Sequence, residues 1–465
     1  MNTIRARTRL LVPVLAAALA LAALAVPSDA APARGGDECP LKALDNADGP
    51  VEITFWHAMT RANEETLIRL TDAFNSSQSQ VQVSLVNQTT YEDTVEKFRN
   101  ALATGDVPDV AQLPETFLQQ AIDSQAILPV QACVDADDYD LSDYLPRVID
   151  YYTVEDTLWA LPFNVSNPVL YYDKNAFIAA GLDPEQPPET LEEVRTASEA
   201  ITASGYPAGY ALKIDSAFFE HFLAKSGKPY VNNGNGRKER ATEVDFDNKQ
   251  GREYFTWMSE MVADGLAVTN ARTGASGIDN YLAIGNRQAA MTIDSIAGLG
   301  TIAQVLGSGQ FAHVDLGVAP MPGPVDKGGV LVGGAAFYIM KDTSDEKQAA
   351  AWEYAKFMNE PENMAEWAAG TGYIPIRESA VDLPVFQQRL SEIPEFIVGF
   401  EQLLEGKANP ATAGPVIGDY LGVRSAIDDE ITRMLSEGTK PKVALKAAKK
   451  NSDEVIQNYN ERVGG

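Results

Sequence analysis

Apolar residues recur along this chain at two different spacings, and the two spacings alternate from about residue 51 onward. In residues 51–57 (VEITFWH) Val, Ile and Phe occupy alternate positions, as in a strand with one buried face. In residues 62–74 (ANEETLIRLTDAF) apolar side chains recur every three or four positions, as in a helix. A strand at 81–86, a helix at 91–105 and a strand at 108–113 continue the rhythm. This alternation predicts an α/β fold with a largely parallel sheet and helices on both faces.

The second half of the chain continues the mixture and ends almost entirely in helix. We expect helices at 188–204, 216–226, 247–264, 417–437 and 441–462, and strands at 288–294, 316–322 and 330–341.

Three junctions along the chain are unusually polar: Gln112–Thr116, Asn164–Asn167 and Thr292–Ala297. Ligands of open α/β sheets bind beyond the carboxyl ends of the strands, at helix N-termini. The polar residues 164–167 directly precede an apolar strand, and two interpretations of them remain open. They form an ordinary turn, or they cross between two lobes where a ligand is held.

The first 30 residues predict a secretory signal. Three arginines precede an apolar stretch from about Leu10 to Val26, and small residues follow up to Ala30, after which we expect cleavage. Because no cysteine stands directly after the small residues to carry a lipid anchor, we expect an exported protein, periplasmic or extracellular. The remainder of the 465 residues exceeds one ordinary core, which favours two lobes.

The chain is strongly acidic. Beyond residue 30 it carries 34 basic and 64 acidic residues. Such a surface repels nucleic acid and anionic membranes, so we expect neither as a partner.

The chain contains only two cysteines, Cys39 and Cys133. In an exported protein an even pair favours a disulfide over two free thiols. We therefore predict a Cys39–Cys133 bridge that fastens the segment before the first strand.

The sequence lacks the motifs of the common enzyme classes. Its three histidines have no metal-ligand spacing, and no nucleophile elbow, P-loop or dinucleotide fingerprint is present. We therefore expect no catalysis, no metal and no cofactor. A secreted hydrolase acting on glycosides or phosphodiesters stays open as the alternative. It would use Glu115 and Asp294 at a separation of about 5–10 Å, which a sequence does not reveal.

Four blocks of the chain resemble one known family. They are FWHAM (55–59), PFNVSNPVLYYDKNAFIAAGLDPEQPPETL (162–191), LVGGAAFYIM (331–340) and MAEWAAGTGYIPI (364–376). The chain resembles, from about Val51 to its end, the extracellular solute-binding proteins of ABC importers, and within them the glycerol-3-phosphate binders. The same family includes binders of maltose and other sugars.

The resemblance implies a two-lobe periplasmic-binding-protein architecture of type II, like that of the maltose binders. It implies a monomer that closes over a small hydroxylated solute (a sugar, a polyol, glycerol-3-phosphate or a glycerophosphodiester) and delivers it to membrane permease subunits. With the signal at 1–30, we expect lobe one to comprise 31–163 plus about 296–335. Lobe two would comprise about 164–295 plus about 336–465.

The resemblance also implies a set of ligand contacts. Tyr91 and Glu115 would contribute from the first lobe, Ser166 from the crossing, and Tyr373 from the second lobe. The further positions implied near the ligand are Asp294, Ser295, Gly333 and Gly334.

The chain departs from the glycerol-3-phosphate binders at positions that matter. Ile214 and Ala217 stand near the family's tryptophans, with Phe218 as the nearest aromatic residue, and Phe400 is expected to replace the phosphate-binding arginine. Lys213 is the one nearby cation expected to be able to restore phosphate binding. These departures predict that a neutral sugar, a polyol or a glycerophosphodiester binds more tightly than glycerol-3-phosphate.

Overall fold

The computed structural model describes residues 38–270, 278–307, 309–325 and 327–464, which all belong to one compact unit. The predicted signal segment 1–30 and its cleavage site lie outside the described residues. Within those residues, no helix combines the length and the apolar character needed to cross a membrane.

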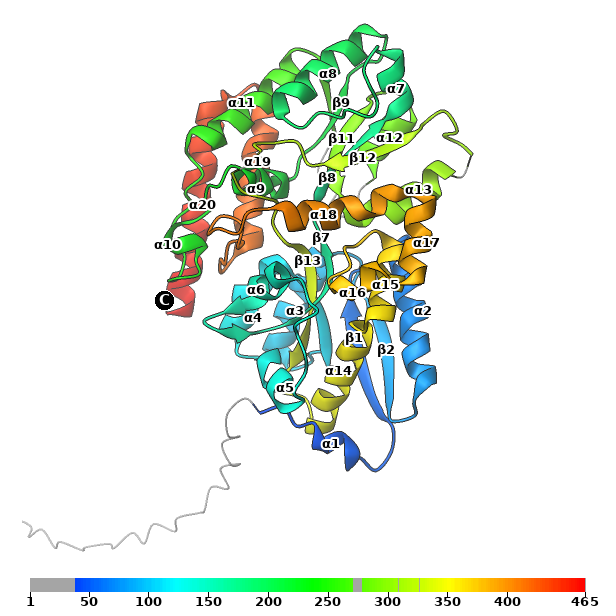
Figure 1. The fold of residues 1–465 in the computed structure, drawn as a ribbon. Coiled ribbons are helices and arrows are strands. Elements are labelled where there is room, and N and C mark those ends of the chain that lie inside the picture. Colours follow the sequence, from blue (N-terminus) through cyan, green and yellow to red (C-terminus); the bar gives the residue numbers. More distant parts are fainter. Residues whose placement is uncertain (1–37, 271–277, 308, 326, 465) are drawn as a thin grey trace, which may run out of the picture. The chain divides into compact units, whose positions relative to one another are not determined.

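The first sheet combines strands of the N-terminal part of the chain with β13, which comes after all the strands of the second sheet (Figure 1). Its order is β2-β1-β3-β13-β4, and β7 pairs with β13. β1 runs parallel to β2 and β3, whereas β13 is antiparallel to β3, β4 and β7. The bounds are β1 Val51–His57, β2 Val81–Asn87, β3 Val110–Pro114, β4 Ile127–Leu128, β7 Leu161–Ser166 and β13 Gly333–Met340.

The second sheet has the order β10-β9-β11-β8-β12. β9 runs parallel to β10 and β11, and β8 runs antiparallel to both β11 and β12. The bounds are β8 Pro168–Asp173, β9 Tyr210–Lys213, β10 Ala267–Asn270, β11 Met291–Ser295 and β12 Leu316–Pro320; a separate hairpin joins β5 Thr153–Val154 and β6 Thr157–Leu158.

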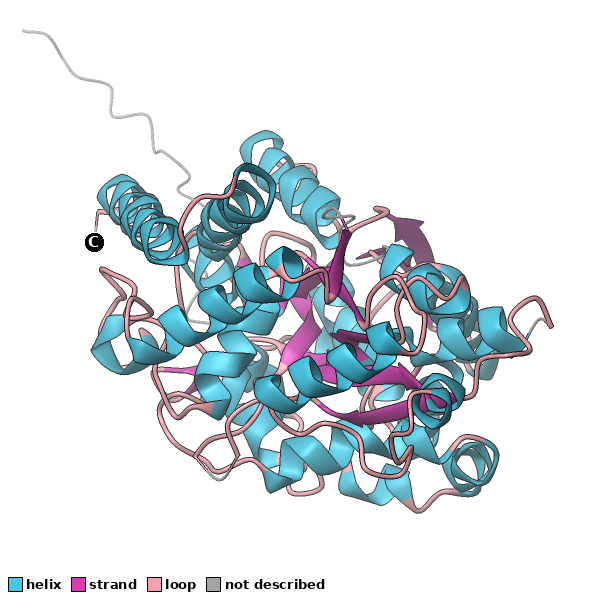
Figure 2. Ribbon diagram, turned by 90° about the horizontal axis from the view of Figure 1, so that it is seen from above, coloured by secondary structure: helices cyan, strands magenta, loops and turns pink. Residues whose placement is uncertain are grey.

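Helices surround the strands, which lie in the interior of the described unit (Figure 2). In the first half they are α1 Lys42–Asp45, α2 Arg61–Ser77, α3 Tyr91–Thr104, η1 Glu115–Phe117, α4 Leu118–Ser124, α5 Val130–Ala136, α6 Pro146–Tyr152, α7 Lys174–Ala179, α8 Leu191–Ala203, α9 Ser216–Lys225, α10 Asn232–Asn235 and α11 Lys249–Ala263. In the second half they are α12 Asp279–Gly285, η2 Ile296–Gly298, α13 Leu299–Gly307, α14 Asp345–Met358, α15 Pro361–Thr371, α16 Glu378–Val381, α17 Pro384–Glu392, η3 Pro394–Ile397, α18 Val398–Glu405, α19 Tyr420–Glu437 and α20 Pro441–Val463. α3 and α14 pack on the first sheet, while α19 and α20 pack on each other and on α11.

The polar residues before β8 form a crossing between the two sheets. Every residue of β7 and of β8 is buried, and Asn167 alone separates the two strands. Its amide donates to the Gly399 carbonyl at 2.8 Å and accepts from Gln402 at 2.7 Å. A buried turn needs such partners for its polar groups. Asp173, at the far end of β8, caps α7 by accepting from the Asn175 N–H.

The predicted disulfide is confirmed. Cys39 is bonded to Cys133, and both residues are buried. The bridge ties the segment before α1 to α5, beneath the first sheet.

The strand pairing differs from the expected division of the chain after residue 295. We expected about 296–335 in lobe one and about 336–465 in lobe two, but β12 lies in the second sheet and β13 lies in the first. The chain therefore returns between Pro320 and Gly333, and β7 extends the first sheet to Ser166 instead of residue 163. Because β12 and β13 are both mostly buried, their apolar patterns do not reveal which sheet they join.

Candidate functional site

A cavity of about 220 Å³ lies where strands of the two sheets end. All the residues that the sequence predicted as ligand contacts line it: Tyr91, Glu115, Ser166, Asp294, Ser295, Gly333, Gly334 and Tyr373. They come from the start of α3, from η1, from the ends of β7 and β11, from the start of β13 and from the loop after α15. The structure thus gathers positions that are up to 282 residues apart in sequence.

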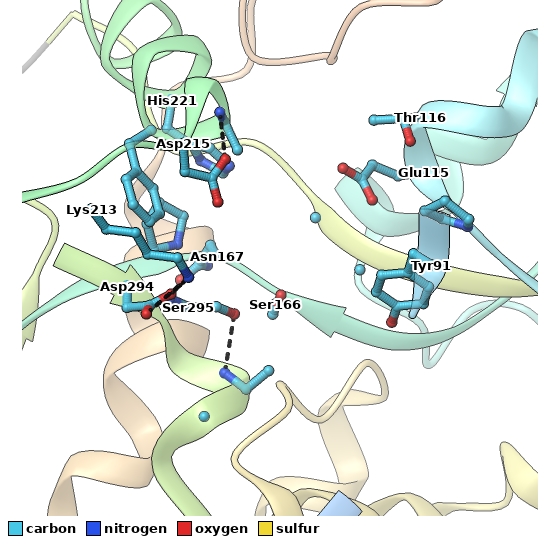
Figure 3. A pocket seen from close by; sticks show the side chains of 18 of the residues that line it. Tyr91, Glu115, Thr116, Ser166, Asn167, Lys213, Asp215, His221, Asp294 and Ser295 are labelled. Atoms are coloured by element: carbon cyan, nitrogen blue, oxygen red, sulfur yellow. Dashed lines mark hydrogen bonds and ion pairs between the residues drawn. The ribbon is translucent and has the colours of Figure 1, made fainter. Parts of the chain in front are cut away.

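The floor of the cavity is the crossing itself (Figure 3). Among the described residues, the Ser166 hydroxyl has no hydrogen-bond partner, so its side chain does not close a local turn. Gly334 has a positive φ of 104°, and a Cβ atom there would collide with the Asn164 carbonyl. Only glycine fits this close approach of β13 to β7.

A chain of buried hydrogen bonds positions Tyr91. Its hydroxyl accepts from the Asn164 amide at 2.6 Å, and the Gln112 amide donates to Asn164 at 2.7 Å. Tyr373 meets Tyr91 hydroxyl to hydroxyl at 3.3 Å. Burial raises the pKa of both phenols, so both stay protonated and able to donate.

Tyr373 differs from its expected origin in the second lobe. Its ring stacks on Trp367, which in turn stacks on Phe163 of β7 in the first sheet. The α15 helix that carries Trp367 packs on α2. Tyr373 therefore approaches the cavity from the side of the first sheet.

A buried cluster of one cation and two carboxylates spans the cavity. The Arg424 guanidinium of α19 donates to Glu115 of η1 at 3.0 Å and to Glu220 of α9 at 2.7 and 2.9 Å. Burial lowers the pKa of Arg424, but the two carboxylates more than offset this effect and hold it well above its ordinary value. Burial dominates at Glu115, whose pKa is raised despite the neighbouring Arg424.

The sequence interpretation missed Arg424 and expected Phe400 at the position of the family's phosphate-binding arginine. Phe400 does not line the cavity; it lies on α18, and its side chain is buried in the core. Arg424 occupies the buried stripe of α19 between Tyr420, Val423 and Ile427. A charged residue on the apolar face of an amphipathic helix is the signal that would have found it.

The residues expected near the family's tryptophan positions lie at the cavity. Ile214, Ala217 and Phe218 all line the cavity at the start of α9. Lys213 precedes them, but it is not a free cation. Its ammonium group lies 3.0 and 3.1 Å from the two carboxylate oxygens of Asp294.

The Lys213–Asp294 pair is fixed on all sides. Asn280 donates to the other face of Asp294 at 2.8 Å, and the backbone N–H of Ser295 donates to it at the same distance. Burial lowers the pKa of Lys213, but Asp294 and Asp215 more than offset it, so the pKa is raised and the ammonium stays charged. The Ser295 hydroxyl accepts from the Ala297 N–H at 3.2 Å and so caps η2.

The cavity as a whole carries more acidic than basic residues. Its described lining contains Arg61, Lys213 and Arg424 against Glu92, Glu115, Asp215, Asp294 and Asp428. His221 also lines it, but burial lowers its pKa to about 3 and leaves it neutral. In Figure 3 the carboxylates of Glu115 and Asp215 point into the space between the two sides.

The hydrolase alternative finds no free pair of carboxylates among its two named residues. Glu115 is bound to Arg424, and Asp294 is held by Lys213 and Asn280. A general acid and a nucleophile need access to the scissile bond. Both proposed groups are instead committed to ion pairs.

Two α/β sheets joined by short crossings, with a polar cavity at the crossing, define the architecture of a two-lobe solute-binding protein. Residues 69–392 match the family of bacterial extracellular solute-binding proteins. The sn-glycerol-3-phosphate-binding periplasmic protein UgpB of Yersinia pestis is 30% identical over 90% of this chain and 94% of its own. This chain belongs to the family of bacterial extracellular solute-binding proteins. The proteins of this family are binding components and not enzymes.

Solved structures show the same fold. The GacH receptor of Streptomyces glaucescens superposes with a TM-score of 0.73 at 20% identity, over 88% of this chain and 99% of the receptor. UgpB from Mycobacterium tuberculosis, solved in complex with glycerophosphocholine, superposes with a TM-score of 0.72 at 22% identity, over 89% of this chain and 99% of that UgpB chain. The predicted two-lobe α/β fold of the maltose-binder type is confirmed.

Proposed function

We propose that this protein captures a small hydroxylated solute outside the membrane and delivers it, as a monomer, to the permease of an ABC importer. The solute carries at most one negative charge: a neutral sugar, a polyol or a glycerophosphodiester. Two relatives fall within this range, since their complexes contain glycerophosphocholine and acarbose, whereas glycerol-3-phosphate, which the name of UgpB gives, is a dianion outside it.

One observation carries the proposal. Residues from at least six separate segments place hydrogen-bonding side chains on a single cavity at the crossing between the sheets. Binding sites of this kind are concave and hold a few convergent polar groups. A ligand there touches both sides at once and so favours their closure.

Unsatisfied polar atoms support a hydroxylated ligand. Among the described residues, the Thr116 hydroxyl and the Asn63 side-chain oxygen are buried at the cavity without a hydrogen-bond partner. A buried polar group without a partner is costly, by about 1–3 kcal/mol. Ligand hydroxyls would satisfy both atoms, and the Ser166 hydroxyl and the Glu115 carboxylate would accept further bonds.

The charges of the cavity support the limit on ligand charge. Arg424 can still face a monoanionic phosphodiester, but Glu115 and Glu220 already neutralise it. A dianionic phosphomonoester would enter a cavity whose described lining has more carboxylates than cations.

We propose a division into lobes that follows the strand pairing. Lobe one comprises 38–166 and 333–392, and lobe two comprises 167–332 and 398–464. In this division the hinge lies at Asn167. The family supports export, and we further propose that the signal is cleaved after Ala30.

Calorimetry with glycerol-3-phosphate, a glycerophosphodiester and a neutral disaccharide tests the proposal. We expect measurable binding of the phosphodiester or the sugar, with a melting temperature that rises with ligand concentration. Folded protein that binds none of these solutes, or that hydrolyses one of them, would overturn it.

A further inference from the structure

We propose that Asp294 determines which ligand charge this protein accepts, because it holds Lys213 as an internal counter-ion. The inference rests on the proposed function and sharpens its substrate class. Asp294 acts through Lys213 and does not itself bind the ligand.

The pair follows from strand register. β9 and β11 run side by side and parallel, with Met291 opposite Tyr210. Three positions further along each strand stand Asp294 and Lys213, at the carboxyl ends that face the cavity. The sheet therefore places an acid and a base next to each other, whatever occupies the cavity.

The carboxylate of Asp294 has no acceptor capacity to spare for a ligand. Lys213 contacts both of its oxygens, the Ser295 N–H donates to one, and Asn280 donates to the other. The side chains of Lys213 and Asp294 are only 4% and 6% exposed. Such a saturated, buried carboxylate serves its neighbours and not the solute.

The ammonium group of Lys213 is the part that would meet an anion. Lys213 lines the cavity beside Ile214 and Phe218, and its Nζ lies 6.0 Å from the centre of the Phe218 ring. If Asp294 were neutral, Lys213 would be a buried cation without its closest counter-ion, which favours an anionic ligand strongly. With Asp294 ionised, that demand is met inside the protein.

A phosphomonoester is therefore disfavoured twice. It finds Lys213 already neutralised, and its second charge approaches the carboxylates of the cavity. Neither effect acts on a neutral sugar or polyol. A monoanionic phosphodiester needs only Arg424 as its cationic partner.

The test is Asp294→Asn, which keeps the shape and the hydrogen bond from Asn280 but removes the charge. We expect glycerol-3-phosphate to bind at least about tenfold more tightly to the variant than to the wild type, since Lys213 would then pair with the ligand phosphate instead of Asp294. Binding of a neutral disaccharide should change less than about threefold.

Two further variants separate this role from a general change in charge. Lys213→Met in the Asp294→Asn background should abolish the gain. Glu96→Gln removes an exposed carboxylate of α3 that does not line the cavity, and should alter glycerol-3-phosphate binding less than about threefold. Equal gains in Glu96→Gln and in Asp294→Asn would overturn the inference.

The wild type gives an independent measurement if Asp294→Asn does not fold. At one pH, its affinity should decrease from the monoanionic glycerophosphodiester to the dianionic glycerol-3-phosphate by about tenfold. Glycerol-3-phosphate as the tightest ligand would overturn the inference and the proposed limit on ligand charge, but would leave the proposed capture of a small hydroxylated solute for an importer intact. Failure of the folded wild type to bind any of the solutes would overturn the proposed function instead.

Discussion

The two buried cations of the cavity are held in different ways. Lys213 and Asp294 lie on neighbouring strands of one sheet, so their contact is fixed by strand register. Arg424 instead joins Glu220, on the same side of the cavity, to Glu115 of η1 on the other side. The Lys213–Asp294 pair sets a constant local charge, whereas the Arg424–Glu115 contact depends on the distance between the two sides of the cavity. On the proposed mechanism the first cluster therefore governs ligand selectivity and the second governs closure.

The largest expected effect comes from removing the cation that spans the cavity. Arg424→Met leaves Glu115 and Glu220 buried without their partner, so the free energy of unfolding should fall by about 3–5 kcal/mol. Ligand affinity should fall at least about tenfold. Urea unfolding and calorimetry measure both quantities.

Arg433 provides the matched control on the same helix, because its side chain is 41% exposed and pairs with Glu430 only one turn away. Arg433→Met should cost less than about 1 kcal/mol. Equal losses in the two variants would contradict a special role for the cluster.

A second variant tests whether the pair within one sheet is self-contained. Lys213→Met leaves the Asp294 carboxylate unpaired and should lower the free energy of unfolding by about 3 kcal/mol. Adding Asp294→Asn should return stability to within about 1 kcal/mol of the wild type, since no buried charge then remains. A double variant no more stable than Lys213→Met would show that the pair is coupled to groups beyond itself.

The pH dependence of stability provides the third comparison. The pKa of Glu115 is raised in the folded protein above its ordinary 4.5, mainly by burial, so the ionised form costs stability. As the pH rises from about 4.5 through its folded pKa, the wild type should lose stability relative to Glu115→Gln. Urea unfolding of both proteins across this range measures the difference.

Asp123 is the control of opposite sign. Its pKa is lowered, because hydrogen bonds from Arg240 and Tyr459 outweigh its burial. Asp123 therefore contributes stability above its ordinary 3.8 that is lost as the pH falls, and Asp123→Asn should lie below the wild type near neutral pH. If Glu115→Gln instead became less stable than the wild type as the pH rose, as is expected for Asp123→Asn, the sign given for Glu115 would be contradicted.

The smallest expected effect lies on the floor between the two clusters. Ser166→Ala should weaken ligand binding about fivefold, the value of one hydrogen bond, and leave stability within about 0.5 kcal/mol. Ser295→Ala should instead cost about 1 kcal/mol of stability, because its hydroxyl caps η2. Thermal unfolding and calorimetry of the two alanine variants distinguish a ligand contact from a cap.

Local patterns in the sequence predicted the alternation of elements and three of the segments that line the cavity, whereas the family resemblance supplied Tyr91, Gly333, Gly334 and Tyr373. Strand and helix spacing revealed the α/β alternation, and the polar junctions at 112–116, 164–167 and 292–297 mark segments that line the cavity. Each of these signals depends only on residues close together in the chain, which is why it can be recognised from the sequence. The two cysteines could be paired because only one pairing exists.

The rest depends on contacts between distant segments. Lys213 and Asp294 were both noticed, but their ion pair follows from the neighbouring order of β9 and β11, which spacing does not reveal. Arg424 was overlooked because α19 comes late in the chain, away from the motifs that carry the resemblance. The sheet membership of β12 and β13 was misjudged because both strands are mostly buried and lack a polar face.

The position of β13 in the first sheet has a consequence for biosynthesis. β13 contacts β3, β4 and β7, yet a ribosome adds it only after all five strands of the second sheet. Until residue 340 has been added, β3 and β7 lack the partner that joins them, and their edges are open to other chains. The first sheet of the nascent chain therefore stays incomplete while the second sheet is synthesised. This order delays folding and leaves time for chaperones to bind the chain.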